Sequence, residues 1–156
     1  MLPLGLGCAA IVIALDQLSK WVILTVVMYP PQIIEVTKFF NLVLVGNRGV
    51  SFGLFASDAE WVQPAFAGFA TLVAVFLAVW MRYAANRFLV LSLGMVIGGA
   101  LGNAIDRLWH GAVVDFLDFH DAGYHWPAFN VADSAITIGV AFIIVEGLFA
   151  GQKQTK

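Results

Sequence analysis

Three aspartates, Asp106, Asp115 and Asp133, stand in or beside the polar segment that separates two long apolar runs, Phe88–Ile105 and Val131–Phe149. Carboxylates are costly at the edge of lipid, since an Asp at mid-bilayer costs about 3 kcal/mol on insertion scales. A chain that gathers several of them at one membrane boundary is expected to use them for chemistry or transport. Paired aspartates are one of the few arrangements that hydrolyse an amide without a metal or a nucleophilic side chain.

Asp115 and Asp133 are the pair that best fits this chemistry. Asp115 follows the third apolar run and Asp133 opens the fourth, so their carboxyl groups can meet if the two helices are neighbours. Two carboxyls that share a site cannot both ionise easily, so one keeps a proton while the other stays charged. The charged one can take a proton from water, the protonated one can polarise the scissile carbonyl, and the pair titrates as a unit.

Both aspartates also have a purely structural interpretation. Asn130 with Asp133 three residues later is typical of a helix N-terminal cap, and an acid there suits the helix dipole. Asp115 alone would be a carboxylate on a solvated loop. Taken singly, each structural interpretation is favoured. The functional hypothesis gains weight from the polar residues in the same short stretch, namely Asn103, Asp106, Arg107 and Asn130.

Several other polar residues could support such a site. Asp16 and Lys20 are four residues apart in the first apolar run, with the acid first, which is the better order for a helical ion pair. A buried pair that orients the helix and a supporting role beside the site both remain open. Asp106 and Arg107 could pair with groups on neighbouring elements and so brace the site. Asn47 and Arg48 could be turn residues or could reach back to the substrate, and the sequence leaves this balanced.

The histidines do not predict a metal centre. His110, His120 and His125 lie near Asp118 and Asp121, but their spacings fit no zinc pattern. A solvated loop with scattered histidines, without metal or cofactor, is expected.

The composition places the chain among membrane proteins. It has 156 residues, of which 61% are hydrophobic and 12% charged, whereas soluble domains carry about 25% charged residues. The length fits a single domain over residues 1–156. A net charge of −2 and the lack of a basic patch exclude nucleic acid as a partner. The single cysteine, Cys8, excludes an internal disulfide and any multi-cysteine metal site.

Four segments are long enough to cross a bilayer, which requires roughly 20 apolar residues. They cover about residues 4–28, 62–81, 88–105 and 131–149, and predict an all-α integral membrane protein. The β-rich loop at about 32–56 contains strand formers, the turn signal Gly46–Gly49 and a possible return strand at Val50–Phe55, so we expect a small β-sheet on the membrane surface. Ser57 and Glu60 fit a capping box for the second span.

A glycine strip in the third span is expected to pack helices together. It consists of Gly94, Gly98 and Gly102, at four-residue spacing. Small-residue strips of this kind let membrane helices approach closely.

The number of spans predicts the orientation. With four spans both termini lie on one side of the membrane, and every polar cluster falls on the other. The termini share their side with the short basic link Arg82–Arg87 and with Lys153 and Lys156, which marks the cytoplasm. Lys38, Arg48 and Arg107 on the other side weaken this count. The prediction is cytoplasmic termini and an active face turned outward.

Five segments of the chain resemble, in order and over nearly its whole length, the signatures of prolipoprotein signal peptidase (signal peptidase II), a bacterial inner-membrane aspartic protease. They are Asp16–Lys20, Asn47–Gly53, Gly98–Arg107, Gly111–Phe116 and Phe129–Ile136. Each motif alone is weak, but the five together are highly specific, and no motif position departs from the pattern.

The resemblance implies four transmembrane helices, a periplasmic β-cradle and a catalytic pair at Asp115 and Asp133. It also implies that the substrate is a diacylglyceryl-modified prolipoprotein, cut on the amino side of its lipid-bearing cysteine. Globomycin-like cyclic peptides are the inhibitors that it implies.

Three rival hypotheses remain from the residues alone. A small ion or proton carrier would use Asp16, Asp106 and Asp133 as relays and would distribute charges across the membrane depth. A Ser–Lys protease would use Lys20 with a serine, the candidates being Ser19, Ser51 and Ser134. A purely structural scaffold would lose no activity when either the aspartates or the serines are substituted.

Overall fold

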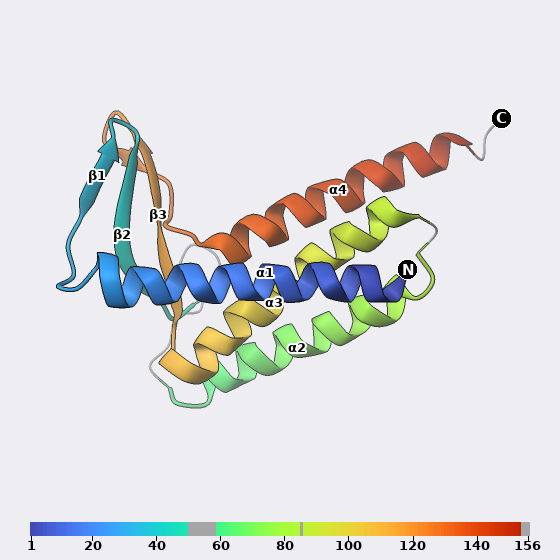
Figure 1. Ribbon diagram of the computed structural model, residues 1–156, viewed down its shortest axis with the longest axis horizontal. Coiled ribbons are helices and arrows are strands. Elements are labelled where there is room, and N and C mark those ends of the chain that lie inside the picture. Colours follow the sequence, from blue (N-terminus) through green and yellow to red (C-terminus); the bar gives the residue numbers. More distant parts are fainter. Residues whose placement is uncertain (50–58, 85, 154–156) are drawn as a thin grey trace.

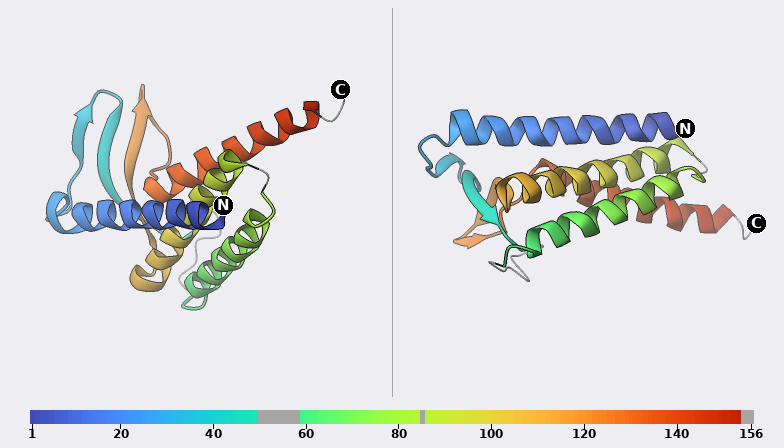
Figure 2. Two further views of the ribbon diagram at one scale, coloured as in Figure 1. Left: turned by 45° about the vertical axis from the view of Figure 1, so that its right-hand side comes forward. Right: turned by 90° about the horizontal axis from the view of Figure 1, so that it is seen from below.

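The computed structural model describes residues 1–49, 59–84 and 86–153 of the chain. Within these residues four helices are long and apolar enough to cross a membrane, at Leu2–Val27, Val62–Met81, Arg87–His110 and Val131–Phe149. They form an elongated bundle with a β-sheet at one end, and both termini lie toward the other end (Figures 1 and 2). The predicted number of spans is therefore confirmed.

Helix α1 covers Leu2–Val22 and continues as a π-helical turn over Ile23–Val27. Helix α2 covers Val62–Met81, α3 covers Arg87–His110 and α4 covers Val131–Lys153. The third helix therefore extends past the predicted end at Ile105, because its polar residues are satisfied by neighbouring elements. Asp106 and Arg107 lie inside α3, beyond the end of the predicted apolar run.

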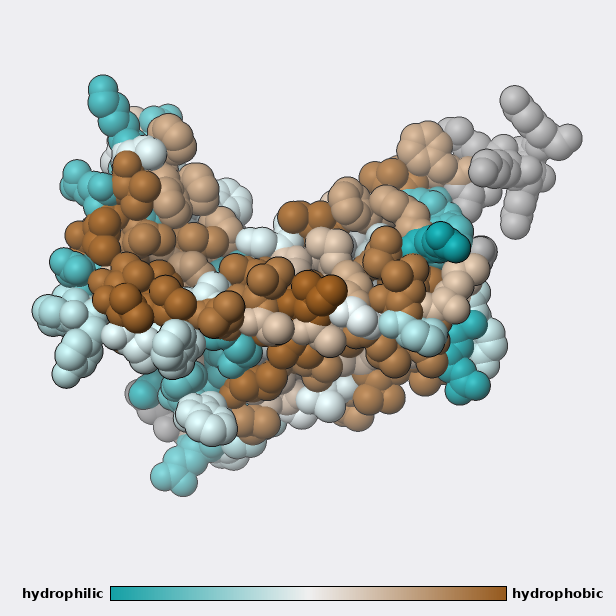
Figure 3. All heavy atoms as spheres, viewed as in Figure 1, coloured by the Kyte–Doolittle hydropathy of each residue, from teal (hydrophilic) through white to brown (hydrophobic). Residues whose placement is uncertain are grey.

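Helix α3 is the centre of the bundle. It packs against α1, α2 and α4 and is mostly buried, whereas the other three helices expose most of their apolar surface. Figure 3 shows these hydrophobic side chains along the helices, and a hollow between the sheet and α4. An apolar exterior of this kind suits a chain surrounded by lipid.

The glycine strip of α3 faces α1, as its packing interpretation predicted. A Cβ added at Gly98 would lie 2.7 Å from Ala9 O and 2.7 Å from Val12 Cβ. One added at Gly102 would lie 2.7 Å from Asp16 Oδ2. Gly99, on the adjacent face, packs closely against the Ala132 carbonyl of α4. Small residues thus bring α1 and α4 close to α3.

Replacing Gly98 by alanine is expected to lower the free energy of unfolding by about 1–3 kcal/mol, because the methyl group must push backbone atoms of α1 away. Thermal unfolding of the purified protein in detergent measures this. Gly68→Ala in α2 is the matched control, since a Cβ at that position meets nothing within 4 Å. Equal unfolding temperatures for the two variants would contradict the close α1–α3 contact.

The sheet draws strands from both long connections. Strands β1 (Ile34–Thr37) and β2 (Phe40–Asn47) come from the first connection, and β3 (Val113–Asp121) and β4 (Tyr124–His125) come from the second. The order is β1-β2-β3-β4, and each neighbouring pair is antiparallel. The prediction of a sheet near residues 32–56 is confirmed in part, and its possible return strand Val50–Phe55 lies outside the described residues.

Two local predictions were wrong. The second connection is not a solvated loop, because it supplies the central strand β3, whose Asp115 and Asp118 are 2% and 6% exposed. The second span does not begin in a Ser57 capping box. Its helix begins at Val62, after Glu60, with Trp61 at the cap position, and Ser57 lies outside the described residues.

Candidate active site

The N-terminus of α4 fixes the position of Asp133. The Asn130 side chain accepts a hydrogen bond from the Asp133 backbone amide at 2.9 Å, and Asp133 Oδ2 accepts one from the Asn130 amide at 3.2 Å. This reciprocal pair caps the N-terminus of α4. The interpretation of Asn130 and Asp133 as a helix cap is therefore confirmed. The other oxygen, Oδ1, accepts a hydrogen bond from Asn103 Nδ2 of α3 at 2.7 Å. The cap therefore also directs the carboxylate toward α3.

Asp115 is held on strand β3 by amides from two other elements. Its Oδ1 accepts a hydrogen bond from Asn130 Nδ2 at 2.7 Å, and its Oδ2 accepts one from Asn47 Nδ2 at 3.1 Å. Asn47 ends β2, whose pairing with β3 brings it alongside Val113. The interpretation of Asp115 as a solvated loop acid is therefore wrong.

One residue, Asn130, joins the two carboxyl groups. It is fully buried, its side chain binds Asp115 and its backbone amide binds Asp133. Burial raises the pKa of Asp115 to about 7, and the nearby charge of Asp133 acts in the same direction. Hydrogen bonds from Asn47 and Asn130 oppose these effects without cancelling them. Asp115 therefore keeps its proton at a pH where an ordinary aspartate is ionised.

A buried charge cluster lies beside the pair. Lys20 Nζ is 2.8 Å from Asp16 Oδ2 and 2.7 Å from Asp106 Oδ2, and it donates a hydrogen bond to Asn103 Oδ1 at 3.2 Å. All three charged residues are at most 2% exposed. The Asp16–Lys20 ion pair that the spacing predicted is present, and Asp106 completes it.

The charge cluster also ties the helices to the strands and to α4. Asp16 Oδ1 accepts a hydrogen bond from the Ala132 amide at 2.9 Å, in the first turn of α4. Asp106 Oδ2 accepts one from the Val114 amide at 3.0 Å, next to Asp115. Each acid of the cluster therefore holds the backbone beside one acid of the pair.

Gln17 is part of the cluster and was missed as a site residue. Its Nε2 lies 3.1 Å from Asp16 Oδ2 and 2.9 Å from Asp106 Oδ1, and donates to both. The sequence did contain an indication of this role, because Gln17 places an amide side chain next to the Asp16–Lys20 pair within an apolar run.

Arg107 and the end of β2 close one side of the site. Arg107 Nη2 donates a hydrogen bond to Gly49 O at 3.0 Å, and its guanidinium carbon lies 5.6 Å from the centre of the Phe66 ring. Arg48 is exposed, and its carbonyl accepts a hydrogen bond from Gln63 Nε2 at 2.6 Å. Arg107 thus connects α3 to the segment that follows Asn47.

Residues 8–149 match the protein family described as signal peptidase (SPase) II. The chain belongs to the signal peptidase II family. It is 51% identical over 146 residues to the lipoprotein signal peptidase of Burkholderia multivorans, a match that covers 92% of this chain and 86% of the relative. The lipoprotein signal peptidase of an Azoarcus species is 48% identical over 153 residues, which cover 97% of this chain and 86% of the relative.

Two solved structures of bacterial membrane enzymes share the fold. One superimposes with a TM-score of 0.82 at 32% identity, and the match covers 97% of this chain and 91% of the other. The second has a TM-score of 0.76 at 33% identity and covers 92% of each chain. The architecture expected from the signal peptidase II resemblance is therefore confirmed.

Among the described residues, the contacts of Lys20 and of the serines do not support a Ser–Lys protease in this member of the signal peptidase II family. The contacts of Lys20 Nζ described above are to oxygens of Asp16, Asp106 and Asn103. The hydroxyls of Ser19 and Ser134 donate to the carbonyls of Asp16 and Asn130, at 2.8 and 2.9 Å. Ser51 lies outside the described residues.

His120 and His125 form a separate group on the sheet, whereas His110 is the last residue of α3. His125 Nδ1 lies 2.9 Å from Asp118 Oδ2, and the His120 and His125 rings stack with centroids 4.8 Å apart. Within the described ranges no three His, Cys, Asp or Glu side chains are grouped as a metal would require.

Proposed function

We propose that this chain is a membrane aspartic endopeptidase that removes the signal peptide from diacylglyceryl-modified prolipoproteins, with Asp115 and Asp133 as the catalytic pair. The cut falls on the amino side of the lipidated cysteine. The observation that carries the proposal is the attachment of both carboxyl groups to Asn130, at the end of the bundle where the sheet begins. Membership of the signal peptidase II family supports the substrate class.

The raised pKa of Asp115 favours Asp115 as the general acid and Asp133 as the general base. Protonated Asp115 donates its proton toward the scissile carbonyl oxygen, while ionised Asp133 takes a proton from the attacking water. The water oxygen bonds to the carbonyl carbon and gives a tetrahedral diol. The diol collapses as Asp133 passes its proton to the leaving nitrogen and Asp115 recovers its own. General acid–base catalysis of this kind contributes typically about 10²–10⁴-fold to the rate.

The remaining site residues are proposed to position this pair. Asn47, Asn103 and Asn130 hold the carboxyl oxygens through the hydrogen bonds described above. Asp16 and Asp106 hold the backbone beside each acid, and Lys20 binds both of these carboxylates. Arg107 fixes the segment around Arg48. Because a small misplacement of reacting groups lowers the rate strongly, these residues support turnover without touching the reacting atoms.

The membrane is proposed to align the substrate with the pair. The acyl chains of the lipidated cysteine remain among membrane lipids between the apolar helices, and the signal helix stays in the bilayer. The scissile bond is then held at the surface, where the sheet meets the bundle (Figure 1). Globomycin-like cyclic peptides would inhibit by presenting a peptide bond to the same two carboxyls.

The proposed location is the bacterial inner membrane, with both termini in the cytoplasm and the sheet in the periplasm. The termini lie toward the same end of the bundle as the link between α2 and α3 (Figure 1). That link carries Arg82 and Arg87, and short basic connections face the cytoplasm.

Cleavage of a lipidated precursor by the purified protein tests the function. Mass spectrometry should find the released signal peptide and a mature chain that begins at the lipidated cysteine. The same precursor without the diacylglyceryl group is the control and should not be cut. Ion flux through proteoliposomes with no precursor cleavage would favour the carrier hypothesis instead.

The pH dependence of cleavage is expected to show a basic limb near pH 7. The raised pKa means that Asp115 is protonated below about pH 7 and loses its proton above it. The general acid is then lost, so kcat/KM should fall as the pH rises through this range. A pH profile of kcat/KM with one lipidated precursor measures it. A rate that stays constant to pH 9 would contradict a protonated Asp115 in the active form.

A further inference from the structure

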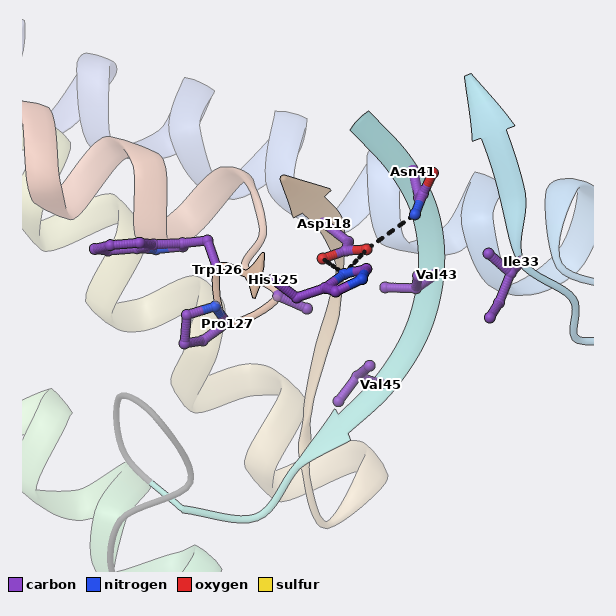
Figure 4. Close-up of a pocket in the computed structure, with 9 residues that line it drawn as sticks. Ile33, Asn41, Val43, Val45, Asp118, His125, Trp126 and Pro127 are labelled. Carbon is purple, nitrogen blue, oxygen red and sulfur yellow. Dashed lines mark hydrogen bonds and ion pairs between the residues drawn. The ribbon is translucent and has the colours of Figure 1, made fainter. Parts of the chain in front are cut away.

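Four tryptophans lie at the end of the bundle that carries the sheet, one at the end of each helix (Figure 1). Trp21 and Trp109 are next to the last residues of α1 and α3, and Trp61 is the cap residue of α2. Trp126 lies in the segment between β4 and α4 (Figure 4). All four are more than half exposed. We call these four residues the tryptophan ring.

The exposure of the tryptophan ring fits a membrane boundary. Tryptophan is enriched where a protein passes from hydrocarbon to lipid headgroups, because its ring is apolar and its N–H needs a polar partner. Between the ring and the opposite end of the bundle, α2 exposes only apolar side chains among its large residues, namely Phe69, Leu72, Val75, Phe76 and Val79. The opposite end has the exposed aromatic residues Trp80 and Tyr83, with Arg82 between them.

The two aromatic levels are separated by the thickness of a bilayer. Trp61 and Trp80 are 19 residues apart along α2, which is about 28 Å of helix. Arg87 and Trp109 are 22 residues apart along α3, which is about 33 Å. The hydrocarbon core of a typical bilayer is about 30 Å thick. The tryptophan ring therefore fits one membrane boundary, and the aromatic and basic residues around the α2–α3 link fit the other.

The catalytic pair lies deeper in the membrane than the tryptophan ring. Asp16 precedes Trp21 by five residues along α1, and Asp106 precedes Trp109 by three along α3. These acids are therefore about 5–8 Å deeper than the ring. They bind the two backbone amides beside the catalytic pair, so the pair has a similar depth. Its distance from the opposite boundary is then about 20–25 Å, which is less than the full hydrocarbon thickness.

Building on the proposed function, we propose that the tryptophan ring holds the catalytic pair at this depth, and that the enzyme thereby selects precursors by the length of their signal helix. A helix that runs from the opposite boundary to the pair covers this distance in about 13–17 residues. Fewer residues suffice where the chain at the cut bond is extended, because each then covers about 3.3 Å. An ordinary membrane helix of about 20 residues would carry its end past the pair into the headgroups.

The test is a series of lipidated precursors that differ only in the number of leucines between the last basic residue of the signal peptide and the cut bond. The total length varies from about 10 to about 22 residues, and kcat/KM is measured in proteoliposomes. The value should be highest at about 17 residues or fewer and should be lower by about tenfold or more at the longest length, because the cost of a mismatch grows with each ångström.

The double variant Trp61→Ala/Trp109→Ala tests the role of the ring. Without these two anchors the depth of the pair is less strictly fixed, so the preference for the short over the longest precursor should fall to about threefold or less. Phe69→Ala is the matched control, since it removes a large exposed side chain from the middle of α2 and should retain the full preference. The preference is a ratio within each variant, so a general loss of folded protein cancels.

The outcomes separate this inference from the proposed function. Equal kcat/KM over the whole series, or a maximum at about 20 residues or more, would overturn the selection by length and leave the peptidase intact. A full preference in the double variant would overturn the role of the tryptophan ring. No cleavage of any precursor by the wild-type protein would overturn the proposed function and this inference with it.

Discussion

Asparagine at position 115 or 133 is expected to lower the turnover of a lipidated precursor by about 10³-fold or more, with no loss of the folded protein. The amide retains the size of the carboxyl group and can still accept a hydrogen bond from Asn130 or Asn103 through its oxygen. It cannot take a proton from water or donate one to a carbonyl oxygen as an acid. Single-turnover cleavage assays on each purified variant measure the loss.

Two controls separate this chemical effect from misfolding. Asp121→Asn changes an exposed acid on the same strand as Asp115 and should retain wild-type turnover. The unfolding temperatures of the two site variants should match or exceed that of the wild type, because protonated Asp115 is already neutral and asparagine at position 133 removes the cost of a buried charge. A site variant that is folded and cuts at the wild-type rate would disprove a catalytic role for its aspartate.

Replacing Lys20 by methionine is expected to destabilise the protein strongly. Lys20 is the cation between Asp16 and Asp106, and its removal leaves two buried carboxylates facing each other. Breaking a buried ion pair by removing one partner costs about 3–5 kcal/mol. Thermal unfolding in detergent should therefore show a midpoint lower by about 10 °C, and cleavage should fall with it because the amides of Ala132 and Val114 lose their fixed positions.

Lys38→Met is the matched control for this loss. Lys38 is exposed, next to the end of β1, so its removal should leave the unfolding midpoint within about 1 °C of the wild type. An unchanged midpoint for Lys20→Met would show that the charge cluster contributes nothing to stability and would remove the basis for its positioning role.

The helices were predictable because their signal is local. Each span is an apolar run long enough to cross a bilayer, and the four runs correspond to the four observed helices. The predicted third span ended at Ile105 because the apolar run ends there, at Asp106 and Arg107. They stay helical because Lys20 and the Gly49 carbonyl bind them, and both partners are distant in the sequence.

Strand β3 was missed for a related reason. Its partner β2 lies about 70 residues earlier, Asn41 pairing with Asp118 and Asn47 with Val113. The acids at 115 and 118 interrupt the pattern of strand formers, so the segment resembles a solvated loop. Only the paired strand and the amides of Asn47 and Asn130 make burial of Asp115 acceptable. The meeting of Asp115 and Asp133 was still predictable, because their positions at adjacent helix ends are a local feature.

The sequence does not show that Asn41 Oδ1 lacks a hydrogen-bond partner among the described residues, nor which groups Gln17 contacts. Each depends on which neighbour binds the other end of the same amide. Gln17 donates to Asp16 and Asp106, and Asn41 turns its nitrogen to Asp118. Side-chain amides look alike in sequence whether they are bound, capping or unpartnered.

Turnover of the double variant Asp115→Asn/Asp133→Asn, compared with both single variants on one lipidated precursor, tests most directly whether the two carboxyls act on a common water. If they act as a unit, removing either one removes all of the acid–base catalysis, and the three variants should cut at the same residual rate. Independent contributions would instead multiply, so a double variant slower than each single variant by the full factor of the other would contradict the shared site.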